Sequence, residues 1–310
     1  MRRLWHVAQF NLTASRAILK VMKRSLFLVA FAIASALTQA QERLSDQIYM
    51  KNGGAAFTLD VFKVAAPNAP CVMWLCSGGW HSDHNDINPG IAKMLNDQGI
   101  SVVEVVHGSQ PRYTLNEIVP QIRRAVRYVR ANASRFGIDP NRIGISGGSA
   151  GGHLSLMMGG TGDDGARNST DPVERTSSVV NAVGVFMPPT DFLNWGKDGF
   201  MPLDSDQMAP YMPAFGVTKD SSKEKIIAIG KAMSPIGYVS NKFPPTLIIH
   251  GDKDALVPIQ QATIMDEALA KLGIDHTLVV IQGGGHDAKT FLEGFPKLVE
   301  WFKAHLAKKG

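Results

Sequence analysis

The stretch that decides the fold is Arg142–Leu156, which reads R-I-G-I-S-G-G-S-A-G-G-H-L-S-L. Alternating apolar residues at its start are typical of a strand, and an amphipathic run begins after the second pair of glycines. Glycines on both sides of Ser149 let the chain reverse where a Cβ would clash. The stretch therefore predicts a strand, a sharp turn and a helix, with the Ser149 hydroxyl held clear of the sheet.

The pattern G-x-S-x-G fits this stretch in two registers, one centred on Ser146 and the other on Ser149. Ser146 would lie inside the strand, whereas Ser149 follows the strand and is itself followed by Ala150 and two glycines. We favour Ser149 for that reason. A phosphate-binding loop is the alternative, but no lysine follows the glycines as such a loop requires.

Composition and charge limit the class of protein. The chain has 310 residues, of which 45% are hydrophobic, and this suggests one large or two small globular domains. The net charge of +5 arises from the first forty residues, which hold six basic side chains and no acidic one. The rest of the chain is nearly neutral, so nothing in the charge supports nucleic-acid binding.

The N-terminal residues 1–40 have the features of a secretory leader. Lys23 and Arg24 precede an apolar run, Leu26 to Leu37, and small residues lead up to Ala40. These features predict a signal peptide cleaved before Gln41. The protein would then be periplasmic or secreted, with no stable membrane association after cleavage; an uncleaved N-terminal anchor is the alternative.

The remaining residues, 41–310, predict one α/β domain with a mostly parallel sheet flanked by helices, because strand and helix patterns alternate. Beside the strand of the opening stretch, the expected strands are 47–50, 57–64, 72–75, 101–106, 179–186, 246–250 and 277–281. The expected helices are 89–98, 114–136, 258–272 and 288–306. The four arginines at 123, 124, 127 and 130 are expected on the solvated face of the second helix.

Two further features depart from this pattern. Residues 188–234 are irregular and rich in proline, methionine and aromatic residues, so we interpret them as a small cap-like insertion that contributes the substrate pocket. A surface excursion packed on itself is the alternative. Cys71 and Cys76 lie five residues apart on one strand, hence on opposite faces, and are not expected to form a disulfide.

A serine hydroxyl needs a base to take its proton and a carboxylate to orient that base. Asp254 and His286 follow two later strands in the order Ser, Asp, His, and are the favoured partners of Ser149. Asp252 and Asp191 are alternative acids, each of which is better explained as capping a turn.

The other histidines are expected to be structural. His153 and His250 are interpreted as packing or hydrogen-bonding residues. The segment H-S-D-H-N-D at 81–86 resembles a metal-binding pattern only weakly and is interpreted as a polar loop at the pocket rim. We therefore expect neither a metal nor a cofactor.

An oxyanion that forms during acyl transfer needs hydrogen-bond donors. The N–H of Ala150 directly follows Ser149. Gly78 and Gly79 lie in the loop Cys76–Trp80 after the 72–75 strand, which is called the oxyanion loop below. We expect these three backbone groups to form the oxyanion hole.

From Val72 to the C-terminus the sequence resembles the α/β-hydrolase superfamily, in its esterase and lipase branch. The segments V-M-W-L-C-S-G-G-W, R-I-G-I-S-G-G-S-A-G-G-H-L and P-P-T-L-I-I-H-G-D-K-D-A-L-V-P are most similar to bacterial feruloyl/acetyl-xylan esterase-like proteins. The resemblance implies an α/β-hydrolase fold and an exported carboxylesterase. One departure is that Cys76 and Ser77 stand where this branch usually has His-Gly before the central glycines.

These features favour a serine carboxylesterase that acts on small-molecule or carbohydrate esters, with acetyl or feruloyl esters as the expected substrates. A peptidase of the prolyl-oligopeptidase type shares the triad layout, but the sequence shows no propeller-sized segment ahead of the first strands. A catalytically silent binding protein on the same fold is the third hypothesis, supported by the altered oxyanion loop alone.

Overall fold

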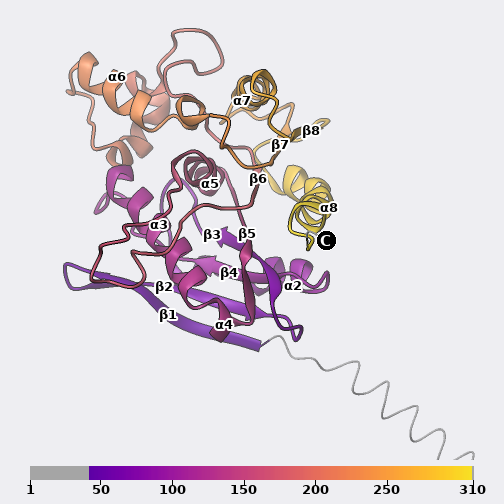
Figure 1. The fold of residues 1–310 in the computed structure, drawn as a ribbon. Helices are drawn as coiled ribbons and strands as arrows, with labels where there is room; N and C mark the ends of the chain where they lie inside the picture. The colour runs from indigo at the N-terminus through magenta and orange to yellow at the C-terminus, as the bar shows by residue number, and fades with distance from the viewer. Residues whose placement is uncertain (1–41, 309–310) are drawn as a thin grey trace, which may run out of the picture. The chain divides into compact units, whose positions relative to one another are not determined.

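A single mixed sheet forms the frame of the protein. The computed structural model describes residues 42–308, so the predicted leader lies outside the described residues. Within this range, eight strands form one sheet in the order β1-β2-β4-β3-β5-β6-β7-β8 (Figure 1). The strands are β1 (Glu42–Asn52), β2 (Ala55–Lys63), β3 (Ala69–Leu75), β4 (Ser101–Val105), β5 (Ile138–Gly148), β6 (Ala182–Phe186), β7 (Thr246–Gly251) and β8 (His276–Ile281).

The strand directions determine where a site can form. From β4 through β3, β5, β6 and β7 to β8 each neighbouring pair is parallel, whereas β2 pairs with β4 in the antiparallel sense. Carboxyl ends of parallel strands meet at one edge, and ligands of open α/β sheets bind there. The loops after β3, β5, β7 and β8 therefore gather at one end of the sheet.

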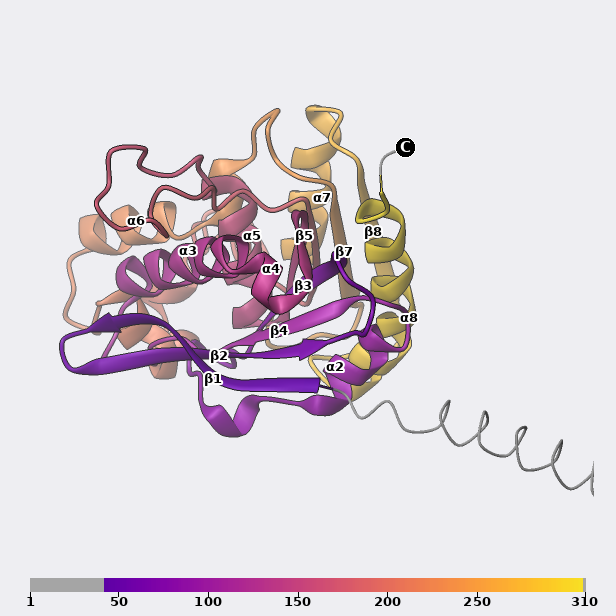
Figure 2. The same ribbon diagram turned by 60° about the horizontal axis from the view of Figure 1, so that its bottom comes forward.

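Helices cover both faces of the sheet. The helices α3 (Leu115–Ala131), α5 (Ala150–Thr161) and α7 (Gln260–Lys271) pack into one apolar cluster. On the other face, α2 (Pro89–Asn96) and α8 (Ala288–His305) pack into a second cluster (Figure 2). This arrangement confirms the predicted α/β class. None of the described helices is both long and apolar enough to cross a membrane.

The predicted helix 114–136 is in fact two helices. Asn132 has φ −105° and ψ 15°, which ends α3, and the short α4 (Ala133–Phe136) stops at Gly137 with φ 68°. Upstream of the serine, β5 begins directly after this glycine, at Ile138. The strand expected at 179–186 begins only at Ala182.

The arginines of α3 correct another expectation. Arg127 is only 8% exposed and forms ion pairs with Asp163 and Glu174. Arg124 pairs with Glu174 as well, with a nitrogen–oxygen distance of 2.7 Å. Arg130 donates to the carbonyl oxygen of Ser177. These side chains fasten the long loop between α5 and β6 to α3, so they do not form a free solvated face.

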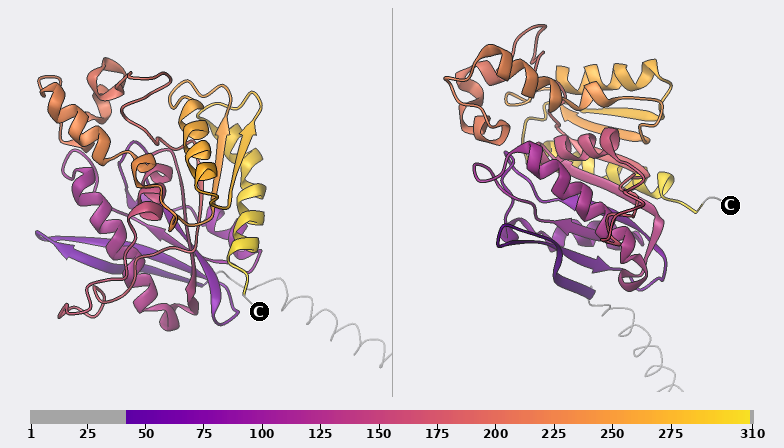
Figure 3. Two further views of the ribbon diagram at one scale, coloured as in Figure 1. Left: turned by 45° about the horizontal axis from the view of Figure 1, so that its top comes forward. Right: turned by 60° about the vertical axis from the view of Figure 1, so that its left-hand side comes forward.

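The segment 188–234 folds into short helices that join the main core. They are η2 (Pro202–Asp204), η3 (Asp206–Phe215) and α6 (Lys223–Ala232), and η4 (Pro235–Tyr238) follows them. Figure 3 shows the segment, in salmon and orange, beyond one end of the sheet. Leu203, Met208 and Phe215 belong to the same apolar cluster as α3 and α5. The segment is therefore no excursion packed only on itself.

Candidate active site

Ser149 occupies the apex between β5 and α5, in a strained backbone conformation. Its φ is 52° and its ψ −118°, which few non-glycine residues adopt and which costs about 1–3 kcal/mol. Two hydrogen bonds hold it there: its N–H donates to Phe186 O at 2.8 Å, and His153 N–H donates to its carbonyl at 2.9 Å. A Cβ on Gly147 would lie 2.6 Å from the carbonyl carbon of Gly151, so this turn requires glycine.

The structure separates the two serines of the opening stretch. Ser146 is fully buried within β5, and its hydroxyl donates to Gly184 O at 2.7 Å. Ser149 instead lines a pocket of about 270 Å³ at the carboxyl edge of the sheet. Only Ser149 is placed to meet a ligand there.

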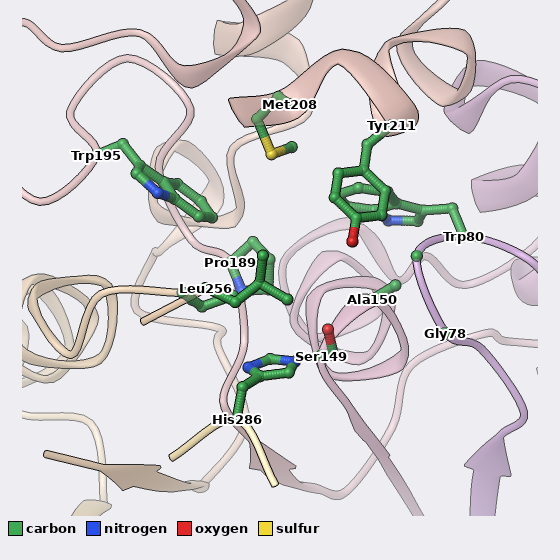
Figure 4. A pocket seen from close by; sticks show the side chains of 12 residues that line it. Gly78, Trp80, Ser149, Ala150, Pro189, Trp195, Met208, Tyr211, Leu256 and His286 are labelled. Carbon is green, nitrogen blue, oxygen red and sulfur yellow. The ribbon is translucent and has the colours of Figure 1, made fainter. Parts of the chain in front are cut away.

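His286 and Asp254 are joined by a short hydrogen bond. His286 Nδ1 lies 2.7 Å from Asp254 Oδ2, and the carboxylate side chain is fully buried. An ionised carboxylate only accepts, so Nδ1 carries the proton and Nε2 is left unprotonated in the neutral ring. Figure 4 shows the His286 ring and the Ser149 hydroxyl pointing into the same pocket.

The Asp254 carboxylate is held in its charged form. Burial alone would raise the pKa of Asp254, but hydrogen bonds from His250, His286 and the N–H of Val257 hold that pKa well below its usual range. Its other oxygen accepts from the N–H groups of Leu256 and Val257 at 2.9 and 2.8 Å. The carboxylate is thus fixed on both sides and ready to orient His286.

The alternative acids have other partners. Asp252 accepts from Gly283 N–H at 2.6 Å and so links the loops after β7 and β8. Asp191 accepts from Leu193 N–H at 2.8 Å and from Asn194, as a turn cap does. Neither carboxylate is hydrogen-bonded to His286.

His250 proves to be more than a strand-end residue. Its Nε2 lies 2.9 Å from Val257 O and 3.4 Å from Asp254 Oδ2. It packs, fully buried, behind the carboxylate that orients His286. The sequence marked His250 as structural, but gave no sign that it supports Asp254.

The predicted oxyanion donors need one correction. Gly78 N–H already donates to His81 O at 3.0 Å, and His81 N–H returns a bond to Gly78 O at 2.9 Å. Gly78 therefore lines the pocket without a free donor. The N–H groups of Gly79 and Ala150 donate to no other group in the described part of the chain. Ala150 is also the first residue of α5, where the helix dipole favours negative charge.

Gln110 supports the loop that carries Gly79. Its side-chain Nε2 donates to Gly79 O at 2.8 Å and to Pro210 O at 3.3 Å, and its backbone N–H donates to Trp80 O at 3.2 Å. One residue therefore holds two successive peptide groups of the loop and links them to η3. No sequence motif pointed to Gln110.

A second support runs through Trp80 and His153. The Trp80 indole N–H can only donate, and it lies 3.1 Å from His153 Nδ1, so that nitrogen is an acceptor. His153 Nε2–H then donates to Met233 O at 2.8 Å. Burial lowers the pKa of His153 to about 4, which keeps the ring neutral as this arrangement requires. These two hydrogen bonds link Trp80, in the loop after β3, to α5 and to the C-terminal end of α6.

The remaining pocket wall is mostly apolar. It is built by side chains from segment 188–234 and from the loop after β7: Pro189, Trp195, Met208, Tyr211, Leu256 and Val257 (Figure 4). In the polar loop 81–86, Asp83 caps the short helix η1 (His84–Asp86). Among the described residues no group of three or more histidine, cysteine or acidic side chains is arranged to hold a metal ion.

Comparison with known proteins places the chain in a family. The model of the family named BD-FAE matches residues 59–269, well over half of the chain. The protein belongs to the BD-FAE family. Esterase LipQ of Mycobacterium tuberculosis is 27% identical to this BD-FAE protein over 232 residues, which cover 71% of this chain and 51% of LipQ. An acetylxylan esterase of Xylanibacter ruminicola is 25% identical over 286 residues, which cover 92% of this chain and 52% of that enzyme.

The BD-FAE chain thus spans about half the length of the curated relatives it matches. Two solved structures cover it more evenly. A truncated carbohydrate esterase from gut microbiota superposes with a TM-score of 0.74 at 25% identity, over 86% of this chain and 97% of the other. An acetyl ester-xyloside bifunctional hydrolase from Caldicellulosiruptor lactoaceticus gives 0.72 at 24% identity, over 86% and 98%. The resemblance to α/β-hydrolase esterases is confirmed.

Proposed function

We propose that the protein is a serine carboxylic-ester hydrolase that works through an acyl-enzyme. The observation that carries this proposal is the meeting of Ser149, the Asp254-oriented His286 and two free backbone donors at one pocket. A serine in a strained elbow, a base held in one tautomer and donors beside the serine are the parts that acyl transfer needs. A catalytically silent binding protein would not require the strained backbone conformation of Ser149.

The proposed reaction has two halves. Ser149 Oγ attacks the ester carbonyl carbon while His286 Nε2 takes the hydroxyl proton and Asp254 stabilises the imidazolium. The oxyanion is bound by the N–H groups of Gly79 and Ala150. The intermediate expels the alcohol, which receives the proton from His286. A water molecule, deprotonated by His286, then attacks the acyl-enzyme carbonyl carbon. The bond to Ser149 Oγ breaks, the carboxylic acid is released, and His286 returns the proton to Ser149 Oγ.

The proposed substrates are acetyl or feruloyl esters of carbohydrates. The apolar wall formed by Trp195, Met208 and Leu256 suits an acyl group. The pocket has a volume of only about 270 Å³, which leaves the alcohol portion of the ester at its mouth. The names of the acetylxylan esterase and of the carbohydrate esterase support a carbohydrate as the alcohol portion of the ester.

Substitution of the two serines tests the mechanism. Hydrolysis of p-nitrophenyl acetate by Ser149→Ala should fall at least about a thousandfold, because loss of the nucleophile disables the whole triad. Ser146→Ala is the matched control and should keep most of the activity, since its hydroxyl only donates to Gly184 O. Equal rates for wild type and Ser149→Ala would refute the proposal.

A substrate panel tests the specificity. Rates on acetyl-xylan, methyl ferulate and p-nitrophenyl acetate should exceed those on peptide p-nitroanilides by several orders of magnitude. Efficient peptide cleavage that disappears in Ser149→Ala would instead establish the peptidase hypothesis.

A further inference from the structure

One hydroxyl in the pocket has no part in the triad. Apart from Ser149, Tyr211 carries the one hydroxyl among the described residues that line this pocket. It comes from η3, in the segment 188–234, and not from the loops that carry the triad. Its oxygen has no hydrogen-bond partner within the described residues, unlike Tyr49 and Tyr238, whose hydroxyls donate to backbone carbonyls.

The Tyr211 ring is held against the oxyanion loop. A Cβ on Gly79 would lie 2.8 Å from Tyr211 Cε1, so the ring rests directly on the Gly79 backbone. The ring also packs edge-on against Trp80, with 5.9 Å between the two ring centroids. The preceding carbonyl, of Pro210, accepts from the same Gln110 amide that holds Gly79 O. Ring and loop are therefore positioned as one unit.

The hydroxyl faces the reacting side of the pocket. Figure 4 shows it directed from η3 toward the side of the pocket where Ser149 and Ala150 lie. This is also the side on which Gly78 has no donor to offer, because its N–H is bonded to His81 O. The loop thus supplies one backbone donor fewer than the sequence led us to expect, and a phenolic donor stands beside it.

We propose that the Tyr211 hydroxyl is the third donor of the oxyanion site, together with the N–H groups of Gly79 and Ala150. The inference rests on the proposed esterase function. A phenol donates one hydrogen bond, and this bond strengthens as the ester carbonyl oxygen gains negative charge, so it favours the transition state over the bound ester. No proton leaves Tyr211. Tyr211, from segment 188–234, thus supplies the donor that Gly78 does not.

Tyr211→Phe tests the proposal, because it removes the hydroxyl and keeps the ring on Gly79 and Trp80. With p-nitrophenyl acetate, kcat should fall about a hundredfold and KM should stay within about twofold, as for loss of one oxyanion donor. Tyr238→Phe is the matched control: its hydroxyl donates to Ala232 O at 2.8 Å and does not line the pocket. Its kcat should equal that of wild type, and both variants should show cooperative thermal unfolding.

The possible outcomes are distinct. An inactive wild type would refute the esterase function itself, and an active Ser149→Ala would refute Ser149 as its nucleophile. An active wild type with an unchanged kcat in Tyr211→Phe would refute only the role of Tyr211. A raised KM with an unchanged kcat would also refute it, because the hydroxyl would then bind the ester equally in the ground state and the transition state.

Discussion

Glu104 is a buried carboxyl group directly behind the oxyanion loop. It is fully buried on β4, where Asn88 N–H donates to its Oε2 at 2.6 Å and the Cys76 thiol lies 3.7 Å from the same oxygen. Its Oε1 has no partner among the described residues, and Asp60 stands directly opposite on β2. Burial raises the pKa of Glu104 to about 7. The side chain therefore keeps its proton in weakly acidic solution.

The raised pKa predicts a pH-dependent stability. Between about pH 4.5 and 7 the folded protein holds a proton that the unfolded chain has lost, so the contribution of Glu104 is greatest at low pH and is lost as pH rises through 7. The free energy of unfolding should fall by about 3 kcal/mol over this pH range. Glu104→Gln, whose side-chain oxygen can still accept from Asn88 N–H, should lose most of this pH dependence. Urea unfolding of both proteins at pH 5 and pH 8 measures the difference, and parallel pH profiles would contradict the assignment.

At this scale the sequence predicts a residue well when its role follows from its place after a strand. Ser149, Asp254 and His286 each lie there, and the structure brings Asp254 and His286 together and both Ser149 and His286 to one pocket. The N–H of Gly78 is unavailable because Gly78 and His81 exchange backbone hydrogen bonds, and no sequence pattern predicts this pairing. Tyr211 and Gln110 come from separate segments, so only the folded chain shows that they meet the loop.

At the scale of elements, α3 is tied to the loop that follows α5. Helical periodicity correctly placed the arginines away from the apolar stripe, but it could not show what lies across from them. Their partners Asp163, Asp171 and Glu174 come from an irregular loop without any period. Segment 188–234 also lacks a regular period, so the sequence predicted the core helices and strands but not the helices of that segment.

Arg127→Met is predicted to destabilise the protein by about 2 kcal/mol, because two charge-assisted hydrogen bonds are lost at a buried position. Lys93→Met is the control. Lys93 pairs with Asp97 on the exposed surface of α2, and its loss should cost less than about 0.5 kcal/mol. Denaturant unfolding at constant pH measures both. Equal effects would mean that the arginine cluster is no more than a surface feature.

At the scale of the whole molecule, the alternation of strands and helices was sufficient to predict the sheet, since parallel neighbours need a crossover between them.

We propose that the chain is exported with residues 1–40 as its leader. N-terminal sequencing of protein recovered outside the cytoplasm of a bacterial host should begin at Gln41. Leu28→Arg, which interrupts the apolar run, should block both export and cleavage. Exported protein that retains residues of the leader would contradict the proposal.

Cys71 and Cys76 have a further consequence as reporters of motion. They lie on the two opposite faces of the sheet, each buried in a different apolar cluster, and burial raises the pKa of both thiols. A thiol reagent can therefore label either residue only when the layer above it opens. Equal labelling rates would mean that the two layers part from the sheet in one cooperative event. Unequal rates would rank the two layers by the free energy of their separate openings.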